Sequence, residues 1–170
     1  EFDQQIPMEF DFVRESEAMT VIAENLAKAG IRDVVIPRVI PGLATRRSIT
    51  MTFVDGVRPD NAVAMKLWGI KPETIATAIG RAIGQMMLVD GFMHADVHLG
   101  NILVLRDGRV CLIDFGQAKR LPEDLRLKLC EFYIALGTGH RLYILKTFGD
   151  LGIELDVDPA ETDEAFLDLV

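Results

Sequence analysis

Three polar residues, Asp96, Asn101 and Asp114, have the types and spacing that metal-assisted phosphoryl transfer requires. Carboxylate and amide oxygens are ligands that Mg²⁺ takes together with phosphate oxygens, and a further carboxylate can orient or deprotonate a nucleophile. Asn101 and Asp114 flank a predicted hairpin, so they can share one cation. We therefore predict Asn101 and Asp114 as metal ligands and Asp96 as the catalytic base or water-orienting group.

These residues must be positioned by helices and strands, and the sequence predicts such elements in an order that gives an α+β arrangement. Apolar residues recur at helical spacing in several segments, and Asp107-Gly108 between two apolar runs is a strong hairpin signal. The segment 57–71 is polar and is predicted to be irregular. The predicted helices cover 12–29, 72–91, a stretch from 122 onward, 140–151 and 160–170. The predicted strands cover 34–40, 48–54, 102–105 and 110–113.

Composition narrows the possible function classes. The 170 residues carry a net charge of −8, and no basic run is longer than Arg46-Arg47. Nucleic-acid binding needs concentrated positive charge, so it is excluded as a partner class, whereas a nucleotide can still bind through a metal ion and backbone amides. No stretch reaches the ~20 apolar residues of a membrane span. Cys111 and Cys130 are expected to be buried free thiols. The chain does not begin with Met, so it is expected to be a segment of something longer.

The order of the motifs is more specific than any one of them. His94, Asp96 and Asn101 form the pattern H-x-D-x-x-x-x-N, and Asp114-Phe115-Gly116 follows it, which is the protein-kinase signature. Singly, each residue could instead cap a turn or end a strand. A metal pair of His94 and His98 is disfavoured because the segment lacks helical periodicity. We expect His94, Phe115 and Gly116 to support the loop and assign no role to His98.

These motifs resemble the UbiB/ADCK family of atypical kinases, whose loop commonly reads H-A-D-P-H-P-G-N. This chain has Val97 and Leu99 where the family usually has prolines. The resemblance implies that Glu9 and Asp11 form the family's E-x-D motif. It also implies that Glu15 is the helix glutamate that pairs with an upstream lysine.

By the same resemblance the fold is protein-kinase-like, mostly the helical C-terminal lobe with helix C and hinge strands of the N-lobe. Residues 1–56 would form the partial N-lobe. Residues 57–170 would form the C-lobe, with the catalytic loop at 92–101 and the Asp-Phe-Gly motif at 114–116. The ATP-binding hinge would be Met51, Thr52 and Phe53, with Thr52 standing where the family usually has a glutamate.

The resemblance further implies ATP and Mg²⁺ or Mn²⁺ as cofactors and a transferase activity that supports coenzyme Q or prenyl-lipid metabolism. Partners would be a nucleotide and lipids or membrane-associated biosynthetic proteins, in mitochondria, plastids or at bacterial membranes. The sequence shows no lysine-bearing strand ahead of Glu15, no phosphate-covering loop and no K-x-G-Q motif. We therefore expect this segment alone to be inactive.

Two alternatives stay open at this point. A small-molecule phosphotransferase of the aminoglycoside or choline kinase type shares the H-x-D-x-x-x-x-N loop and a later metal aspartate. A pseudokinase would use the same residues to bind nucleotide and regulate partners without turnover. Helix is predicted to resume at Pro122, so little room follows Gly116 for a peptide-docking segment. This favours a small-molecule or lipid-linked substrate, or ATP hydrolysis, over protein phosphorylation.

Overall fold

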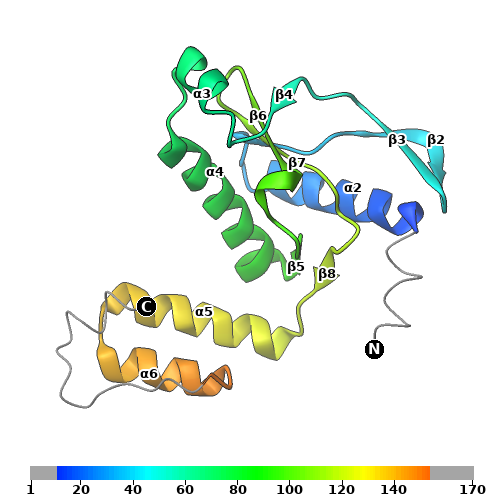
Figure 1. Ribbon diagram of the computed structural model, residues 1–170. Coiled ribbons are helices and arrows are strands. Elements are labelled where there is room, and N and C mark those ends of the chain that lie inside the picture. Colours follow the sequence, from blue (N-terminus) through cyan, green and yellow to red (C-terminus); the bar gives the residue numbers. More distant parts are fainter. Residues whose placement is uncertain (1–10, 154–170) are drawn as a thin grey trace. The chain divides into compact units, whose positions relative to one another are not determined.

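The computed structural model describes residues 11–153, which divide into two units, one up to Arg120 and one from Leu121 (Figure 1). The helices are α2 (Phe12–Lys28), α3 (Ala62–Trp68), α4 (Pro72–Gly84), α5 (Glu123–Thr138) and α6 (Arg141–Asp150), with a π-helical turn at Gln85–Asp90 and a 3₁₀ turn at Leu99–Asn101. The strands are β1 (Val34–Val35), β2 (Val39–Thr45), β3 (Ser48–Met51), β4 (Gly56–Val57), β5 (Phe92–Met93), β6 (Ile102–Leu105), β7 (Val110–Leu112) and β8 (Lys119–Arg120).

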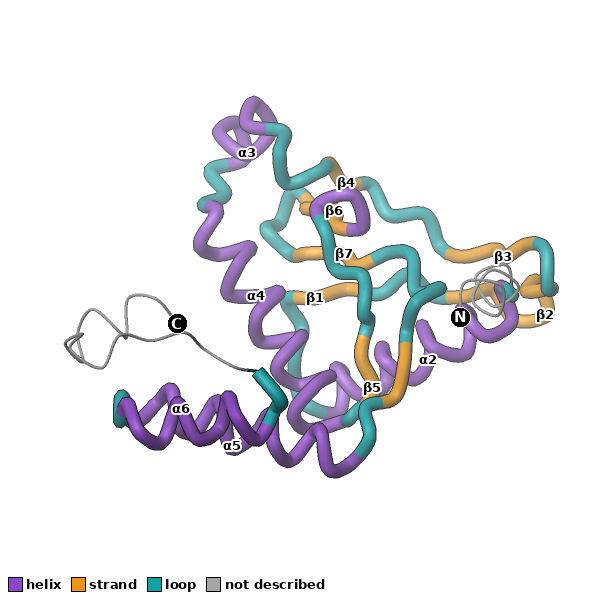
Figure 2. Tube along the Cα trace, turned by 60° about the horizontal axis from the view of Figure 1, so that its bottom comes forward, coloured by secondary structure: helices purple, strands orange, loops and turns teal. Residues whose placement is uncertain are grey.

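The first unit is built around the predicted hairpin of β6 and β7. Its register pairs Ile102 with Leu112 and Val104 with Val110, and Gly108 makes the turn with a φ of 86°. The hairpin is the centre of a four-stranded sheet in the order β1-β7-β6-β4, in which only β1 runs parallel to its neighbour. Figure 2 shows α4 and α2 beside these strands. Residues 94–101, which we call the polar loop, lead directly into this central hairpin.

Helix α2 packs its predicted apolar stripe into the core. Asp11 caps its N-terminus by accepting a hydrogen bond from the Val13 N–H at 3.1 Å. Met19, Ile22 and Leu26 are almost completely buried in the same core as α4 and the hairpin strands. The prediction of a helix over 12–29 is confirmed to within one residue.

Two predictions of local structure are wrong. Residues 57–71 contain helix α3, which Asn61 caps by accepting from the Ala64 N–H at 3.0 Å and which Gly69 ends in the left-handed conformation. The segment 34–40 is not one strand but contains all of β1, a break around Pro37 and the start of β2. Proline has no N–H to donate to a strand ladder, which accounts for the break.

Helix α4 begins at Pro72 as predicted, and the helical run through the π-helical turn ends at Gly91 with a φ of 59°. Strand β5 follows at once and pairs with β8, with Phe92 opposite Arg120. The chain on both sides of the hairpin is thus tied together, and the polar loop lies between β5 and β6.

The second unit contains α5 and α6, joined at Gly139. Ala135 and Ile144 are its buried centre, and the rings of Phe132 and Phe148 meet edge to face at 4.8 Å. The helix predicted over 140–151 is confirmed, whereas that predicted over 160–170 lies outside the described residues.

Among residues 11–153, no helix is long and apolar enough to cross a bilayer. Neither cysteine forms a disulfide; Cys111 is buried as expected, but Cys130 is only half-buried.

Candidate functional site

Asn101 ties the polar loop to the hairpin. Its side-chain Nδ2 donates to the backbone carbonyl of Asp96 at 3.1 Å and to the Asp96 carboxylate oxygen Oδ2 at 3.4 Å. Its own carbonyl accepts from the Ile113 N–H at 3.0 Å, one residue before Asp114. Asn101 is 7% exposed, whereas the Asp96 side chain is 37% exposed. The structure therefore brings Asp96 and Asn101 together and places Asn101 beside the strand that leads to Asp114.

His94 braces the loop from its other end. The ring is 1% exposed and lies 4.6 Å from the Phe115 ring. Its Nδ1 accepts from the Asp96 N–H at 3.2 Å, so Nε2 carries the proton and donates to the Ile113 carbonyl at 3.0 Å. Both ring nitrogens are engaged, which argues against the His94–His98 metal pair.

Asp114 lies in a left-handed backbone conformation, with a φ of 61°. Aspartate tolerates this region better than most residues, but the conformation is still uncommon outside glycine. Its Oδ1 accepts from the Gly116 N–H at 3.4 Å, which makes a tight local turn. The turn directs the chain away from the hairpin and leaves a carboxylate at the end of β7.

Glu15 connects α2 to this turn. Its Oε1 accepts a hydrogen bond from the Phe115 N–H at 3.1 Å, although the two residues are 100 positions apart. Burial is the main factor that raises the pKa of Glu15, and the Asp114 charge adds to it, while the Phe115 N–H acts in the opposite direction. The sequence predicted Glu15 as the partner of a lysine, and it did not predict this bond to Phe115.

The loop holds a further residue for which the sequence indicated no role. His98 Nδ1 accepts from the Gly100 N–H at 2.9 Å, and its Nε2 lies 3.6 Å from Asp96 Oδ2. The sequence signal for this contact is that His98 follows Asp96 by two positions. Two residues at that spacing in a tight turn can face each other.

The predicted hinge residues lie at the end of β3 and directly after it. Met51 ends β3, and Phe53 is 91% exposed. Thr52 forms two hydrogen bonds of 2.9 Å with Arg38, one from its backbone N–H to the Arg38 carbonyl and one in which its Oγ1 accepts the Arg38 N–H. The Thr52 N–H is therefore engaged in the pairing of β2 with β3.

Of the predicted E-x-D motif, Glu9 lies outside the described residues. Asp11 caps α2, and its Oδ2 lies 3.6 Å from Nε of Arg46 in the turn between β2 and β3. Asp11 is therefore a helix cap that also lies near the guanidinium group of Arg46. The structure does not bring Asp11 into hydrogen-bonding contact with Asp96, Asn101 or Asp114.

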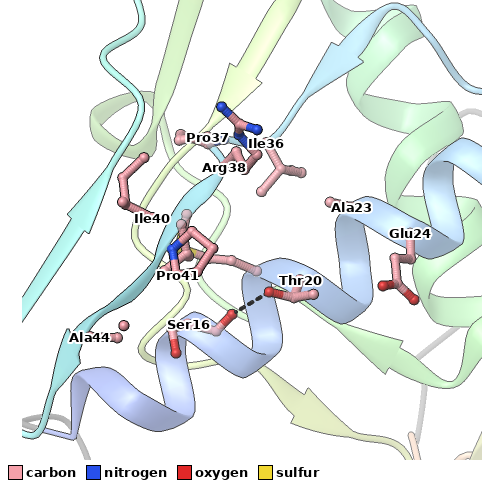
Figure 3. A pocket seen from close by; sticks show the side chains of 13 residues that line it. Ser16, Thr20, Ala23, Glu24, Ile36, Pro37, Arg38, Ile40, Pro41 and Ala44 are labelled. Atoms are coloured by element: carbon pink, nitrogen blue, oxygen red, sulfur yellow. Dashed lines mark hydrogen bonds between the residues drawn. The ribbon is translucent and has the colours of Figure 1, made fainter.

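Three of the cavities that described residues line lie in the first unit. One of about 670 Å³ lies between α2 and β2 and contains none of the predicted site residues (Figure 3). A second, of about 220 Å³, is bordered by Glu15, Phe115 and Gly116. A third, of about 300 Å³, is almost entirely apolar, lies against α3 and α4, and has Leu99 of the polar loop on its edge.

These features define the class of fold to which the first unit belongs. An α+β unit in which a helix glutamate contacts an Asp-Phe-Gly turn, and in which an H-x-D-x-x-x-x-N loop enters the preceding hairpin, is a segment of the protein-kinase-like fold. The solved complex of Rv3197 with erythromycin from Mycobacterium tuberculosis supports this fold. It matches with a TM-score of 0.58 at 22% identity over 92% of this chain and 39% of that chain.

The chain belongs to the family described as the ABC1 atypical kinase-like domain, whose profile matches residues 1–147. AarF domain-containing protein kinase 1 of Gallus gallus is 30% identical over 80% of this chain and 27% of its own length. A protein of Synechocystis is 36% identical over 80% of this chain and 35% of its own length. The predicted UbiB/ADCK resemblance is thereby confirmed, and the chain spans only about a quarter to a third of the length of these relatives.

Proposed function

We propose that this chain carries the metal-binding part of the ATP site of an atypical kinase or ATPase. Asn101 and Asp114 bind Mg²⁺ or Mn²⁺, and Asp96 orients or deprotonates the nucleophile. The observation that carries the proposal is the tie of Asn101 to both Asp96 and the Ile113 N–H. It holds the predicted nucleophile-orienting group and the two predicted ligands around the ends of one hairpin. The family match supports a phosphotransferase in general.

The donor chemistry of the site fits a hard divalent cation. Among the described residues, no group of three or more His, Cys, Asp or Glu side chains is placed to hold a metal ion. Asn101 and Asp114 alone would not complete the coordination of a cation, and water together with nucleotide phosphates would supply the further oxygens. This is the usual situation of Mg²⁺, which binds one or two carboxylates together with phosphates. A bound cation would also offset the negative charge that Asp114 exerts on Glu15.

The nucleotide would extend from this cation toward β3 and the predicted hinge. Because the Thr52 N–H is engaged with Arg38, the hydrogen bonds to adenine must come from other backbone groups of the hinge. The cavity of about 220 Å³ at Glu15 leaves room for the ammonium group of a lysine beside the carboxylate. Active kinases require such a pair, so we expect no ATP turnover from the 170 residues alone.

The acceptor is proposed to be a small or lipid-linked molecule. Helix α5 resumes at Glu123, and the few residues between Gly116 and Pro122 are occupied partly by β8. A peptide-docking segment has no room there. The apolar cavity at Leu99 suits an alkyl or isoprenoid portion of a substrate, and the family resemblance favours a role in coenzyme Q or prenyl-lipid metabolism. Lipids or membrane-associated biosynthetic proteins are the corresponding partners.

Binding of MgADP, measured by calorimetry on the 170-residue chain, tests the metal site. Asp114→Asn removes the ligand charge without backbone strain, because asparagine also tolerates a positive φ. Asp107→Asn makes the same change at the exposed tip of the same hairpin and is the matched control. We expect Asp114→Asn to weaken MgADP binding about tenfold or more. We expect Asp107→Asn to bind MgADP as tightly as wild type. In EDTA, without a divalent cation, wild type and Asp114→Asn should bind ADP equally well.

Turnover must be measured in the longest natural form of the protein. Asp96→Asn is expected to keep MgADP affinity and to abolish ATP turnover there. Wild type that binds MgADP but never turns ATP over would identify a pseudokinase. Wild type in the longest form that binds no MgADP would refute the ATP site altogether.

A further inference from the structure

His98 occupies a position in the polar loop that the proposed chemistry has not yet used. Its imidazole stands between the Gly100 N–H and the Asp96 carboxylate, at 2.9 Å from the former and 3.6 Å from the latter. The side chain is 56% exposed, so it is not held there by packing in the core. What holds it is a single hydrogen bond to the backbone of its own loop.

That hydrogen bond fixes where the imidazole proton is. When the ring is neutral, Nδ1 accepts from the Gly100 N–H with its lone pair, which places the proton on Nε2. Nε2 is the atom that faces Asp96 Oδ2. His98 therefore presents an N–H, rather than a lone pair, to the Asp96 carboxylate.

The consequence falls on one oxygen of Asp96. Asn101 Nδ2 lies 3.4 Å from Oδ2 and His98 Nε2 lies 3.6 Å from the same atom, so two N–H donors flank Oδ2. No hydrogen bond among the described residues engages the other oxygen, Oδ1. A carboxylate with donors on one oxygen keeps the other directed away from them, which is the geometry that a nucleophile-orienting group needs.

We propose that His98 is a positioning residue for Asp96. It holds Oδ2 through its Nε2–H so that Oδ1 faces the nucleophile. The separation of 3.6 Å is longer than a hydrogen bond, and such contacts shorten when a reactant binds. This inference rests on the proposed function, because positioning matters only if Asp96 acts on a substrate.

Gly100 makes this arrangement possible. A Cβ at Gly100 would stand 2.7 Å from Cε1 and 2.9 Å from Nδ1 of His98, which is closer than any real contact. The imidazole is the movable partner, so Gly100→Ala would displace the ring and leave the loop backbone in place. The loop thus requires glycine at position 100 for His98 to stay beside Asp96.

The tautomer can be measured without catalysis. Long-range ¹H–¹⁵N NMR spectra of the 170-residue chain, in mildly alkaline buffer, distinguish the two neutral tautomers of each imidazole. We expect wild-type His98 to be the Nε2–H tautomer and Gly100→Ala to show a mixture. Wild-type His98 that is Nδ1–H or mixed would overturn the proposal, whatever the turnover of the protein.

Two substitutions separate the two bonds of the ring in the longest natural form. His98→Asn keeps an acceptor near the Nδ1 position but cannot reach Asp96. His98→Gln keeps a donor near the Nε2 position but loses the bond to Gly100. If His98 positions Asp96, kcat falls about tenfold more in His98→Asn than in His98→Gln, with KM for ATP similar in both. Equal losses would mean that His98 only shapes the loop and would overturn the proposal.

The outcomes also separate this proposal from the proposed function. Wild type that binds no MgADP refutes the ATP site. Wild type that binds MgADP without turnover refutes the enzyme, and with it a positioning role for His98. Turnover with equal losses in the two variants refutes only the role of His98.

Discussion

The hydrogen bond from the Phe115 N–H to Glu15 gives a prediction of stability that two substitutions can isolate. Glu15→Ala leaves a buried N–H without its acceptor, which costs about 1–3 kcal/mol. Glu15→Gln keeps an amide oxygen in the same place and removes the charge that burial and Asp114 disfavour. We therefore expect Glu15→Ala to be less stable than Glu15→Gln by about 2 kcal/mol.

Urea unfolding measures this difference. With a slope of about 2 kcal/mol per molar urea, the two midpoints should differ by about 1 M. Glu17→Ala, an exposed glutamate on the same helix, is the matched control and should change stability by no more than about 0.5 kcal/mol. Equal stabilities of Glu15→Ala and Glu15→Gln would show that the bond to Phe115 does not stabilise the turn.

The pH dependence gives a second test of the same site. The pKa of Glu15 is raised above its ordinary value of 4.5 in the folded protein, chiefly by burial. A raised pKa means that the folded state holds the proton more tightly than the unfolded state. The stability from this group is therefore fully present below the unfolded pKa and is lost as pH rises through the folded pKa. Glutamine does not titrate, so the stability of Glu15→Gln relative to wild type should increase as the pH rises above the ordinary glutamate pKa of 4.5. A constant difference would refute this account.

Three further predictions concern the core around the site. Gly56→Ala should destabilise the protein by about 1–3 kcal/mol in urea unfolding, because its Cβ would stand 3.0 Å from the Leu103 Cβ. Burial raises the pKa of the Cys111 thiol to about 11, so in a Cys130→Ser background iodoacetamide should label Cys111 only as fast as the protein opens. His94→Ala removes two hydrogen bonds and a buried ring, so thermal unfolding should show a loss of about 3 kcal/mol. A fall in the Tm of His94→Ala of less than a few degrees would contradict this expected loss of stability.

The sequence was informative where local signals and tertiary packing agree. The Asp107-Gly108 turn between two apolar runs predicted the hairpin, and in the structure β6 and β7 pair antiparallel on either side of this turn. Pro72 and Gly91 predicted the ends of a helical run correctly. In both cases the signal is a backbone preference of the residue itself, which the folded protein does not need to override.

The sequence was uninformative where the structure depends on pairs of distant residues. No local pattern indicates that Glu15 accepts from Phe115, because the bond exists only after α2 has packed beside the hairpin. Helix α3 was missed for a different reason. It is only two turns long. Its segment was predicted to be irregular because most of the residues around the helix are polar, and the helix cap at Asn61 was not recognised. Short helices depend on their caps and on packing more than on composition.

The conformation of Asp114 shows why these distant contacts matter for the site. A non-glycine residue at a φ of 61° costs about 1–2 kcal/mol, and it persists only where its surroundings fix it. Here the N–H of Ile113 is held by Asn101, the carbonyl of Ile113 by His94, and the N–H of Phe115 by Glu15. The peptide groups on both sides of Asp114 are therefore fixed by three separate elements. The protein fixes the backbone at Asp114 by its own contacts, so a cation that bound to the carboxylate, as proposed, would not have to order this turn.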